Sequence, residues 1–451
     1  MRRQDVFASS QILVFNPVLK EEPEVKAQYF YYLKSLIRLG KWEKKKYTKA
    51  QLAFYKEILC GENTGGYISN KKNRISSRLC YLMPYDIAIL LAYRENVIQT
   101  KKEAVIINKI VSDFNLSAKS ADFLYREFDA ALGDAEAWKE VLNNRVITGF
   151  KQYLKTVKAN IFFIRQYPYN ILITATMSAG KSTLINVLAG RNISLMQNMA
   201  CTSKIHNIVS KPFDDGVSSE YDHDLSLNAS KEDLLSDNED NFSSKITVGT
   251  YFNSYLAGHR VVLLDSPGVN SSENEEHREI SYRIIRSKKY KLLLYVMNAT
   301  QLGTNDEEQH LEMVKKHLGR AKILFIINKI DNLISEDDNL LDVIENQRHF
   351  LCSKGFKNPM ICPVSARAAF LVKKSRQEGL NRIEHREMNN YIDKFEQNSL
   401  ANYYERDLGC PAIANSNDEE ESLFRNCGFA YLEQMIEHLS NGGKKDGTGL
   451  C

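Results

Sequence analysis

A short run of small and polar residues carries the strongest chemical signal in this chain. Its members are Ala175, Thr176, Met177, Ser178, Ala179, Gly180, Lys181, Ser182 and Thr183. In such a loop the backbone N–H groups converge on anionic oxygens, Lys181 adds a positive charge, and Ser182 offers a hydroxyl to Mg²⁺. We therefore expect residues 176–183 to bind the phosphates of a nucleotide.

One position of this loop departs from the usual pattern. Ala175 stands where a glycine normally lets the backbone approach the phosphates closely. The alternative interpretation is a chance Gly-Lys-Ser sequence at the start of a helix. Three later segments of the chain argue against that alternative.

The first of these segments is an apolar run, residues 261–264, that ends in Asp265 and is followed by Gly268. An aspartate at the end of such a strand reaches the Mg²⁺ shell in phosphate-loop proteins, and the glycine N–H meets the γ-phosphate. We expect Asp265 and Gly268 to act in this way.

The second segment is the apolar run 323–327, which leads into Asn328 and Lys329 and then Asp331. A carboxylate at Asp331 can accept hydrogen bonds from N1–H and N2–H₂ of guanine, which adenine does not offer. Leaving such buried groups unpaired costs about 1–3 kcal/mol each. We expect Asn328, Lys329 and Asp331 to contact the nucleotide and to select guanine.

The third segment, residues 361–364, is a short apolar run that leads into Ser365 and Ala366. A backbone N–H in this turn can bind O6 of guanine. Each of the three segments is weak evidence alone, but together and in this order they predict that the nucleotide is GTP.

A threonine is also needed that closes over Mg²⁺ and the γ-phosphate when the triphosphate is bound. Thr202 lies between the phosphate loop and Asp265 and precedes a predicted strand. Ser203 is the nearest alternative, and an ordinary loop hydroxyl is another.

The elements that position these residues follow from the hydrophobic pattern. Residues 169–173, 261–264, 323–327 and 361–364 each read as a strand, and residues 184–188 read as a helix directly after the phosphate loop.

These segments together resemble the GTPase domain of the dynamin superfamily, especially that of bacterial dynamin-like proteins. The resemblance covers roughly residues 169–441 and extends to residues 264–270 and 298–302. The long spacing from Thr202 to Asp265 also fits, because small signalling GTPases have a much shorter connection there. The resemblance implies an α/β fold, in which a P-loop GTPase domain has a mostly parallel sheet with helices on both faces.

The resemblance also implies a mechanism. In dynamins a polar side chain and a serine of the phosphate loop, with a monovalent cation, neutralise transition-state charge, often when two GTPase domains meet. Ser178 matches the serine, Met177 replaces a glutamine of eukaryotic dynamins, and Val269 replaces the water-orienting glutamine of small GTPases. The expected catalytic residues are Ser178, Lys181, Thr202 and Gly268, and the expected Mg²⁺ ligands are Ser182, Thr202 and Asp265.

Two functions remain open at this point. The first is a GTPase with slow basal hydrolysis that GTP-dependent homodimerisation stimulates. The alternative, which Met177 and Val269 favour, is a regulatory scaffold that binds GTP, hydrolyses it negligibly and acts through a partner protein.

Composition agrees with a large cytoplasmic protein. The chain has 451 residues, 43% of them hydrophobic, a net charge of +4 and no long apolar run. Its eight cysteines include no Cys-x-x-Cys pair and read as reduced thiols. We expect no nucleic acid partner.

One basic cluster keeps peripheral membrane attachment open. It consists of Lys41, Lys44, Lys45, Lys46 and Lys49. Such a cluster could bind anionic headgroups, and the alternative is a solvated helix end.

The expected domains are an all-α module of unknown task, a neck-like helix with a linker, the GTPase domain with an acidic insertion, and a flexible tail. The neck helix is expected to pack against a helix over residues 420–439. Known dynamins continue into a long helical stalk that is absent after residue 441, so this chain is a fragment, a stalkless member or the partner of a stalk-bearing chain. The expected limits are 1–134, 135–167, 168–441 with the insertion at 211–245, and 442–451.

Overall fold

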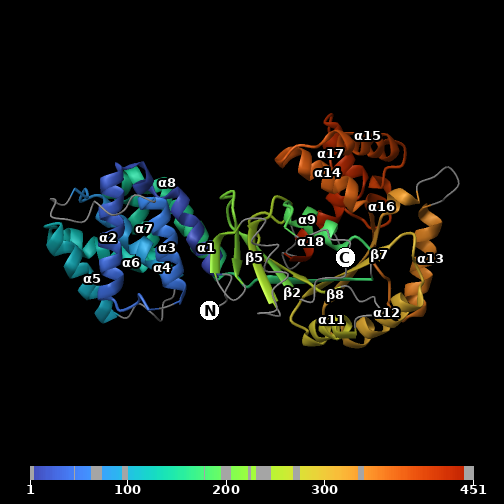
Figure 1. Cartoon of the computed structure of the whole chain (residues 1–451), viewed down its shortest axis with the longest axis horizontal. Helices are drawn as coiled ribbons and strands as arrows, with labels where there is room; N and C mark the ends of the chain where they lie inside the picture. Colours follow the sequence, from blue (N-terminus) through green and yellow to red (C-terminus); the bar gives the residue numbers. More distant parts are fainter. Residues whose placement is uncertain are drawn as a thin grey trace. The chain divides into compact units, whose positions relative to one another are not determined.

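The computed structural model describes residues 5–44, 46–61, 74–93, 100–176, 178–193, 205–221, 225–229, 245–267, 275–333 and 340–440. The chain divides into two compact units (Figure 1). The first consists of Met1–Tyr167 and Lys211–Ala229, and the second of Pro168–Ser210 and Ser230–Cys451. Residues 135–167, which we set apart as a neck, thus lie in the first unit, and their role as a neck stays a proposal.

The first unit is a helical assembly around one fully buried helix, α4 (Met83–Leu90). This helix packs against α1, α2, α3 and α6, and apolar residues of several further elements, among them η3, α5, α7 and α8, complete the surrounding core. The elements of this unit are α1 (Asp5–Ser10), η1 (Gln11–Phe15), η2 (Pro17–Lys20), α2 (Pro23–Leu39), α3 (Lys46–Cys60), η3 (Leu79–Leu82), α4, α5 (Thr100–Asp113), α6 (Ala118–Ala131), α7 (Ala135–Asn143), η5 (Arg145–Phe150), α8 (Lys151–Arg165), β3 (Ser218–Tyr221) and β4 (Leu225–Ala229).

The hairpin of β3 and β4 lies in the acidic insertion, for which the sequence predicted no strands. The two strands pair in antiparallel register, and Tyr221 and Leu227 form a small core with Phe7. The polar composition of the insertion predicts at most one short helix, near residues 231–235, and these residues lie outside the described part of the chain.

A buried carboxyl group ties the helices of the first unit together. Asp86 of α4 accepts hydrogen bonds from Asn16 Nδ2 at 2.8 Å and from the hydroxyls of Tyr29, Tyr55 and Tyr153. Burial raises the pKa of Asp86 to about 6, although the four donors work in the opposite direction.

This shift predicts a pH dependence of stability. A carboxyl whose pKa is higher in the folded than in the unfolded state gains protons on folding, so the free energy of unfolding falls as pH rises from about 4 to about 6. Ionisation of Asp86 lowers the free energy of unfolding by about 3 kcal/mol once the pH has risen above both pKa values. Asp86→Asn, which cannot ionise, is expected to flatten this slope in urea unfolding of the full chain.

The matched control for this experiment is Asp122→Asn, since Asp122 lies exposed on α6 of the same unit. It should keep the wild-type slope. If the Asp86→Asn chain also keeps the wild-type slope between pH 4 and 6, the buried carboxyl is not the group that titrates.

The second unit is an α/β domain with a mostly parallel sheet, as the sequence predicted. Its described strands run in the order β5-β2-β6-β1-β7-β8-β9. The pairs β1–β6, β1–β7, β7–β8 and β8–β9 are parallel, whereas β2 pairs with β6 in antiparallel register. The strands are β1 (Tyr169–Ala175), β2 (Ile205–Lys211), β5 (Lys245–Tyr251), β6 (Val261–Asp265), β7 (Leu292–Asn298), β8 (Lys322–Asn328) and β9 (Ile361–Val364).

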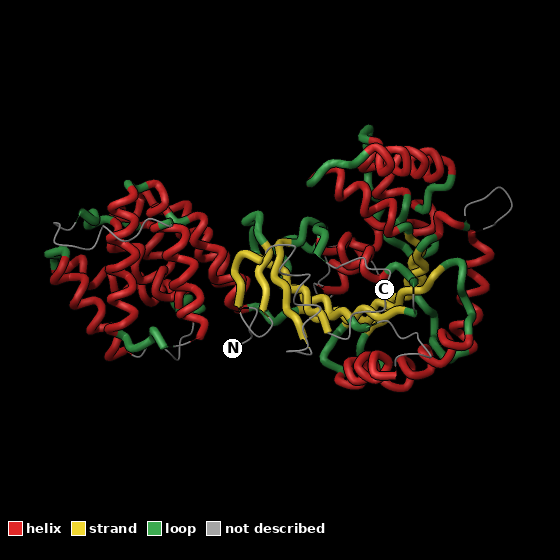
Figure 2. The backbone as a smooth tube through the Cα atoms, in the orientation of Figure 1, coloured by secondary structure: helices red, strands yellow, loops and turns green. Residues whose placement is uncertain are grey.

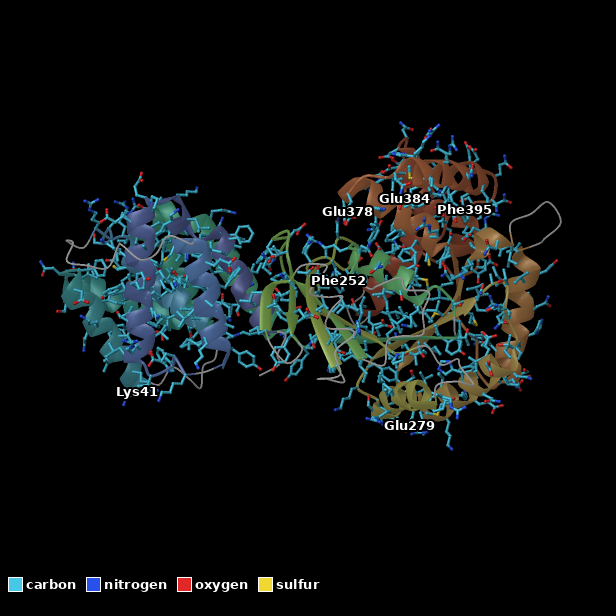
Figure 3. The ribbon with its side chains drawn as sticks, in the orientation of Figure 1. Lys41, Phe252, Glu279, Glu378, Glu384 and Phe395 are labelled. Carbon is cyan, nitrogen blue, oxygen red and sulfur yellow. The ribbon has the colours of Figure 1, made fainter. Side chains whose placement is uncertain are left out.

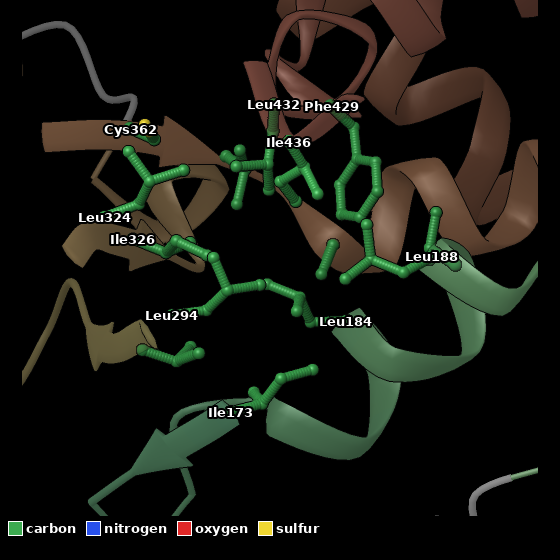
Figure 4. Packing of buried hydrophobic residues seen from close by; sticks show 14 of the residues in the cluster. Ile173, Leu184, Leu188, Leu294, Leu324, Ile326, Cys362, Phe429, Leu432 and Ile436 are labelled. Carbon is green, nitrogen blue, oxygen red and sulfur yellow. The ribbon is translucent and has the colours of Figure 1, made fainter. Parts of the chain in front are cut away.

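Helices cover both faces of this sheet, with α9 and α18 on one face and α11 and α12 on the other (Figures 1 and 2). Leu184 and Leu188 of α9 and Leu432 of α18 pack over the strand residues Ile173 and Leu294 (Figure 4). The helices are α9 (Lys181–Ala189), α11 (Glu275–Ser287), α12 (Asn305–His317), η6 (Ile330–Asn332), α13 (Leu340–Ser353), α14 (Ala366–Gln377), α15 (Arg382–Gln397), α16 (Ala401–Arg406), α17 (Glu419–Asn426) and α18 (Phe429–Ser440).

The prediction of a single helix over residues 420–439 is wrong, because the structure has two helices there, α17 and α18. Gly428 separates them with φ +84°, and a Cβ at this position would lie 2.5 Å from the carbonyl oxygen of Pro363. Only glycine fits such a close approach in this region of φ.

Two further findings concern the described residues only. None of their helices is both long and apolar enough to cross a membrane. Their cysteines are all free, namely Cys60, Cys80, Cys352, Cys362, Cys410 and Cys427.

Candidate functional site

The predicted phosphate loop lies between the carboxyl end of β1 and the first turn of α9. Ser178 has φ +59° and is exposed, and Gly180 has φ +82° and directly precedes the helix. A Cβ at Gly180 would lie 2.3 Å from Nδ2 of Asn328, so a larger residue cannot take its place without a shift. The loop therefore presents backbone groups at a helix N-terminus, which is the geometry that binds anions.

The strand that enters the loop is supported by a buried neutral histidine. Oγ1 of Thr174 lies 3.2 Å from Nε2 of His310 on α12. Burial lowers the pKa of His310 to about 3, so its ring carries no charge at neutral pH. The imidazole therefore supports this end of β1 without adding a second positive charge beside that of Lys181.

Asn328, at the end of β8, joins two of the predicted segments. Its Nδ2 donates to the carbonyl oxygen of Ala179 at 2.8 Å, and its Oδ1 accepts from the backbone N–H of Ala366 at 2.9 Å. The side chain is buried, with 2% of its surface exposed. One amide thus holds the phosphate loop and the turn after β9 at a common edge of the sheet.

The second predicted base contact, Asp331, is fixed from two sides. Ser365 Oγ donates to Asp331 Oδ1 at 2.6 Å, and Lys394 Nζ of α15 donates to the carbonyl oxygen of Asp331. Lys329 stands before it with φ +64°, which turns the chain sharply after β8. Lys394 was not predicted, because it lies 63 residues from Asp331 and its helix shows only an ordinary amphipathic pattern.

Lys181 and Asp265 meet at the ends of α9 and β6. Nζ of Lys181 forms an ion pair with Oδ1 of Asp265, and their side chains are 14% and 11% exposed. In the parallel pairing of β1 and β6, Asp265 aligns with Ile173. The next residue, Ser266, donates two hydrogen bonds to the carbonyl oxygen of Ile173, one from its backbone N–H and one from its hydroxyl. Lys181 and Asp265, predicted to contact phosphate and Mg²⁺ respectively, therefore lie at the same edge of the sheet as Asn328.

Comparison with known families agrees with this geometry. Residues 171–330 match the family model that describes the dynamin family. This stretch of the second unit is thus similar to the dynamin family. The resemblance that the sequence motifs indicated is thereby confirmed.

Comparison with individual proteins finds only distant matches. No curated protein matches the chain. A solved structure of an Era variant from Aquifex aeolicus bound to GDP·AlF4⁻ is 20% identical with a TM-score of 0.28, and the match covers 45% of this chain and 52% of Era. An oligomerised bacterial dynamin pair, described as sensing and tethering membranes, is 16% identical with a TM-score of 0.38, and the match covers 94% of this chain and 61% of that one. The match thus spans less than two thirds of the length of either structure.

Three predicted site residues of the dynamin-type domain lie outside the described residues, namely Met177, Thr202 and Gly268. Their roles stay predictions. Ser182 and Thr183, in contrast, lie half-buried in the first turn of α9, directly after Lys181.

The described donor set fits a magnesium ion. Ser182 and Asp265 offer hard oxygen donors, which Mg²⁺ prefers. Within the described ranges, no group of three His, Cys, Asp or Glu residues could hold a metal. Mg²⁺ commonly takes only one or two protein ligands and completes its shell with phosphate and water, where it neutralises phosphate charge.

Replacing Asn328 by alanine is expected to loosen this site. The change removes two hydrogen bonds and leaves the carbonyl oxygen of Ala179 and the N–H of Ala366 without their partner. We expect a loss of about 2–3 kcal/mol in the free energy of unfolding, measured with urea. The control is Asn398→Ala, because Asn398 is exposed at the end of α15 and bonds only within that helix terminus. Equal stability of both variants would show that Asn328 does not hold the loop.

Proposed function

We propose that the dynamin-type domain binds GTP together with Mg²⁺ and hydrolyses it. In this proposal Lys181 and the backbone of residues 176–183 bind the phosphates, while Ser182, Thr202 and Asp265 hold the metal. The observation that carries the proposal is the pair of hydrogen bonds by which Asn328 links Ala179 to Ala366, because they bring the phosphate loop and the predicted base-binding turn together.

Selection of guanine is the second part of the proposal. It is supported by the hydrogen bond from Ser365 to Oδ1 of Asp331, since this bond orients the carboxylate and leaves its other oxygen for the base. The backbone N–H groups of Ser365 and Ala366 are engaged by Cys427 and Asn328 respectively, so a contact to O6 of guanine would need one of these bonds to exchange.

Activation by self-association is the third part. Ser178 is exposed on the loop, which leaves its hydroxyl accessible to the face of a second GTPase domain and to a monovalent cation. An outside group that neutralises charge contributes about 10³–10⁵ in rate to phosphoryl transfer. We therefore propose a GTP-dependent homodimer whose GTPase domains meet at this loop.

Single-turnover hydrolysis at several protein concentrations tests these proposals. The rate per molecule should rise with concentration, and light scattering should show dimers with GTP and monomers with GDP. A flat rate near zero, with GTP binding retained, would reject the hydrolysing enzyme in favour of the regulatory scaffold that Met177 and Val269 favour.

Cytoplasmic location, peripheral contact with a membrane surface and a stalk-bearing partner chain also stay proposals. Cosedimentation of the full chain with vesicles, with and without GTP, would test the membrane contact.

A further inference from the structure

A basic groove of about 420 Å³ lies between α2 and α3 in the first unit. Its lining combines apolar and cationic side chains. The cationic residues are Lys34, Arg38, Lys44, Lys49 and Lys56, with the single acidic residue Glu43, and the apolar lining consists of buried Phe30 and Leu52 and exposed Ala53.

Helical spacing places these cations on both sides of the groove. Lys34 and Arg38 lie one turn apart on α2, and Lys49 and Lys56 lie two turns apart on α3. At a rise of about 1.5 Å per residue, the charges on α3 span roughly 10 Å. Lys44, in the connection between the two helices, adds a further charge.

Most of this positive charge has no counter-charge within the protein. Among the described residues, Lys34, Lys44, Lys49 and Lys56 form no ion pair, whereas Arg38 pairs with Glu43 at 3.1 Å. All five basic side chains are exposed. Like charges held this close repel one another, and a bound anion would relieve the repulsion.

The groove differs from the basic cluster that the sequence suggested. It uses Lys44 and Lys49 of that cluster and adds three cations from α2 and the middle of α3. Lys41, labelled in Figure 3, does not line it. In the folded structure the groove therefore has cations on both sides, an arrangement that the spacing of the lysines in the sequence did not predict.

We propose that this groove binds an anion that carries more than one phosphate group. One phosphate can contact only a few of these cations at once, whereas two or more phosphates match charges spread over roughly 10 Å. The source of the anion is a soluble polyphosphate or the phosphorylated headgroup of a lipid. This site lies in the first unit, and the phosphate loop lies in the second.

Calorimetric titration of inorganic tripolyphosphate into the full chain tests the proposal. The titration uses a Lys181→Ala background, so that the phosphate loop does not contribute. We expect binding at one site, tighter for tripolyphosphate than for pyrophosphate or orthophosphate, and weakened by salt because the charges are exposed.

The test variant is Lys34→Gln with Lys49→Gln, which removes one cation from each side of the groove. Its affinity should fall about tenfold or more. The matched control is Lys119→Gln with Lys139→Gln, which removes the same charge from exposed positions of α6 and α7. The control should bind as the parent chain does.

Vesicle flotation separates the two sources. Vesicles with cardiolipin, whose headgroup carries two phosphates, are compared with vesicles of phosphatidylcholine alone. Binding to cardiolipin vesicles that the groove variant loses assigns the site to a lipid, and tripolyphosphate binding without vesicle binding assigns it to a soluble anion. If neither probe binds, or if the groove variant and the control bind equally, the proposal is wrong.

Discussion

A chain with Lys181→Ala is expected to lose GTP binding while it keeps its fold. Lys181 begins α9, and its ammonium group forms an ion pair with Asp265 at the proposed phosphate site. In the proposed function this ion pair gives way to phosphate oxygens when the nucleotide binds, and the ammonium group then contacts the phosphates. Charge-assisted bonds to phosphate are strong, and we expect affinity to fall about 100-fold or more in a titration with a fluorescent GTP analogue.

The control for this variant is Lys322→Ala. Lys322 is exposed at the start of β8, at the strand end opposite to Asn328. The substitution removes the same charge from the same sheet, and the Lys322→Ala chain should bind GTP as the wild type does. Wild-type affinity in the Lys181→Ala chain would contradict the assignment of the phosphate loop, and circular dichroism would show whether both chains are folded.

The convergence of the site could be predicted because it follows from strand order. Asp265 and Asn328 each end an apolar run, and carboxyl ends of parallel strands meet at one edge of a sheet. The residue types at those ends therefore indicated the site before any contact was known. The confirmed α/β class rests on the same runs, since continuous apolar strands are typical of a parallel sheet covered on both faces.

The contacts that hold the site in place could not be predicted in the same way. Asn328 was expected to touch the nucleotide, but its bonds to Ala179 and Ala366 depend on how three separate loops meet. Lys394 reaches Asp331 from a helix far along the chain. Neither the hydrogen bonds of Asn328 nor that of Lys394 changes the local hydrophobic periodicity, which is the main signal that a single sequence provides.

The two errors in secondary structure have identifiable causes. The hairpin of β3 and β4 lies in a polar, acidic segment with few apolar residues to indicate strands. Its composition therefore predicted a solvent-exposed loop. The break between α17 and α18 was missed because an apolar stripe continues across Gly428. A glycine inside a helical pattern is often tolerated, and only its tight contact with Pro363 makes it a terminus here.

The buried network around Asp86 illustrates a different limit. An aspartate inside the apolar run of α4 could be recognised as an unusual buried acid. Its partners Asn16, Tyr29, Tyr55 and Tyr153 come from four segments, so only the folded structure identifies them.

Replacing Asp331 by asparagine is expected to change the preferred base from guanine to xanthine. The hydrogen bond from Ser365 Oγ requires an acceptor, so the oxygen of the new amide should keep the place of Oδ1 and the amide nitrogen should face the base. That nitrogen can donate to the C2 carbonyl of xanthine but cannot accept from N1–H and N2–H₂ of guanine. Competition between GTP and xanthosine triphosphate for the fluorescent analogue should therefore shift by about tenfold or more toward xanthine.

Two further variants make this last experiment decisive. Asp393→Asn, which changes an exposed carboxylate on α15, should keep the preference for guanine. Ser365→Ala removes the donor that orients Asp331, so it should weaken binding of GTP without creating a preference for xanthine. A chain with Asp331→Asn that still prefers GTP would show that Asp331 does not read the base, whatever the phosphate loop binds.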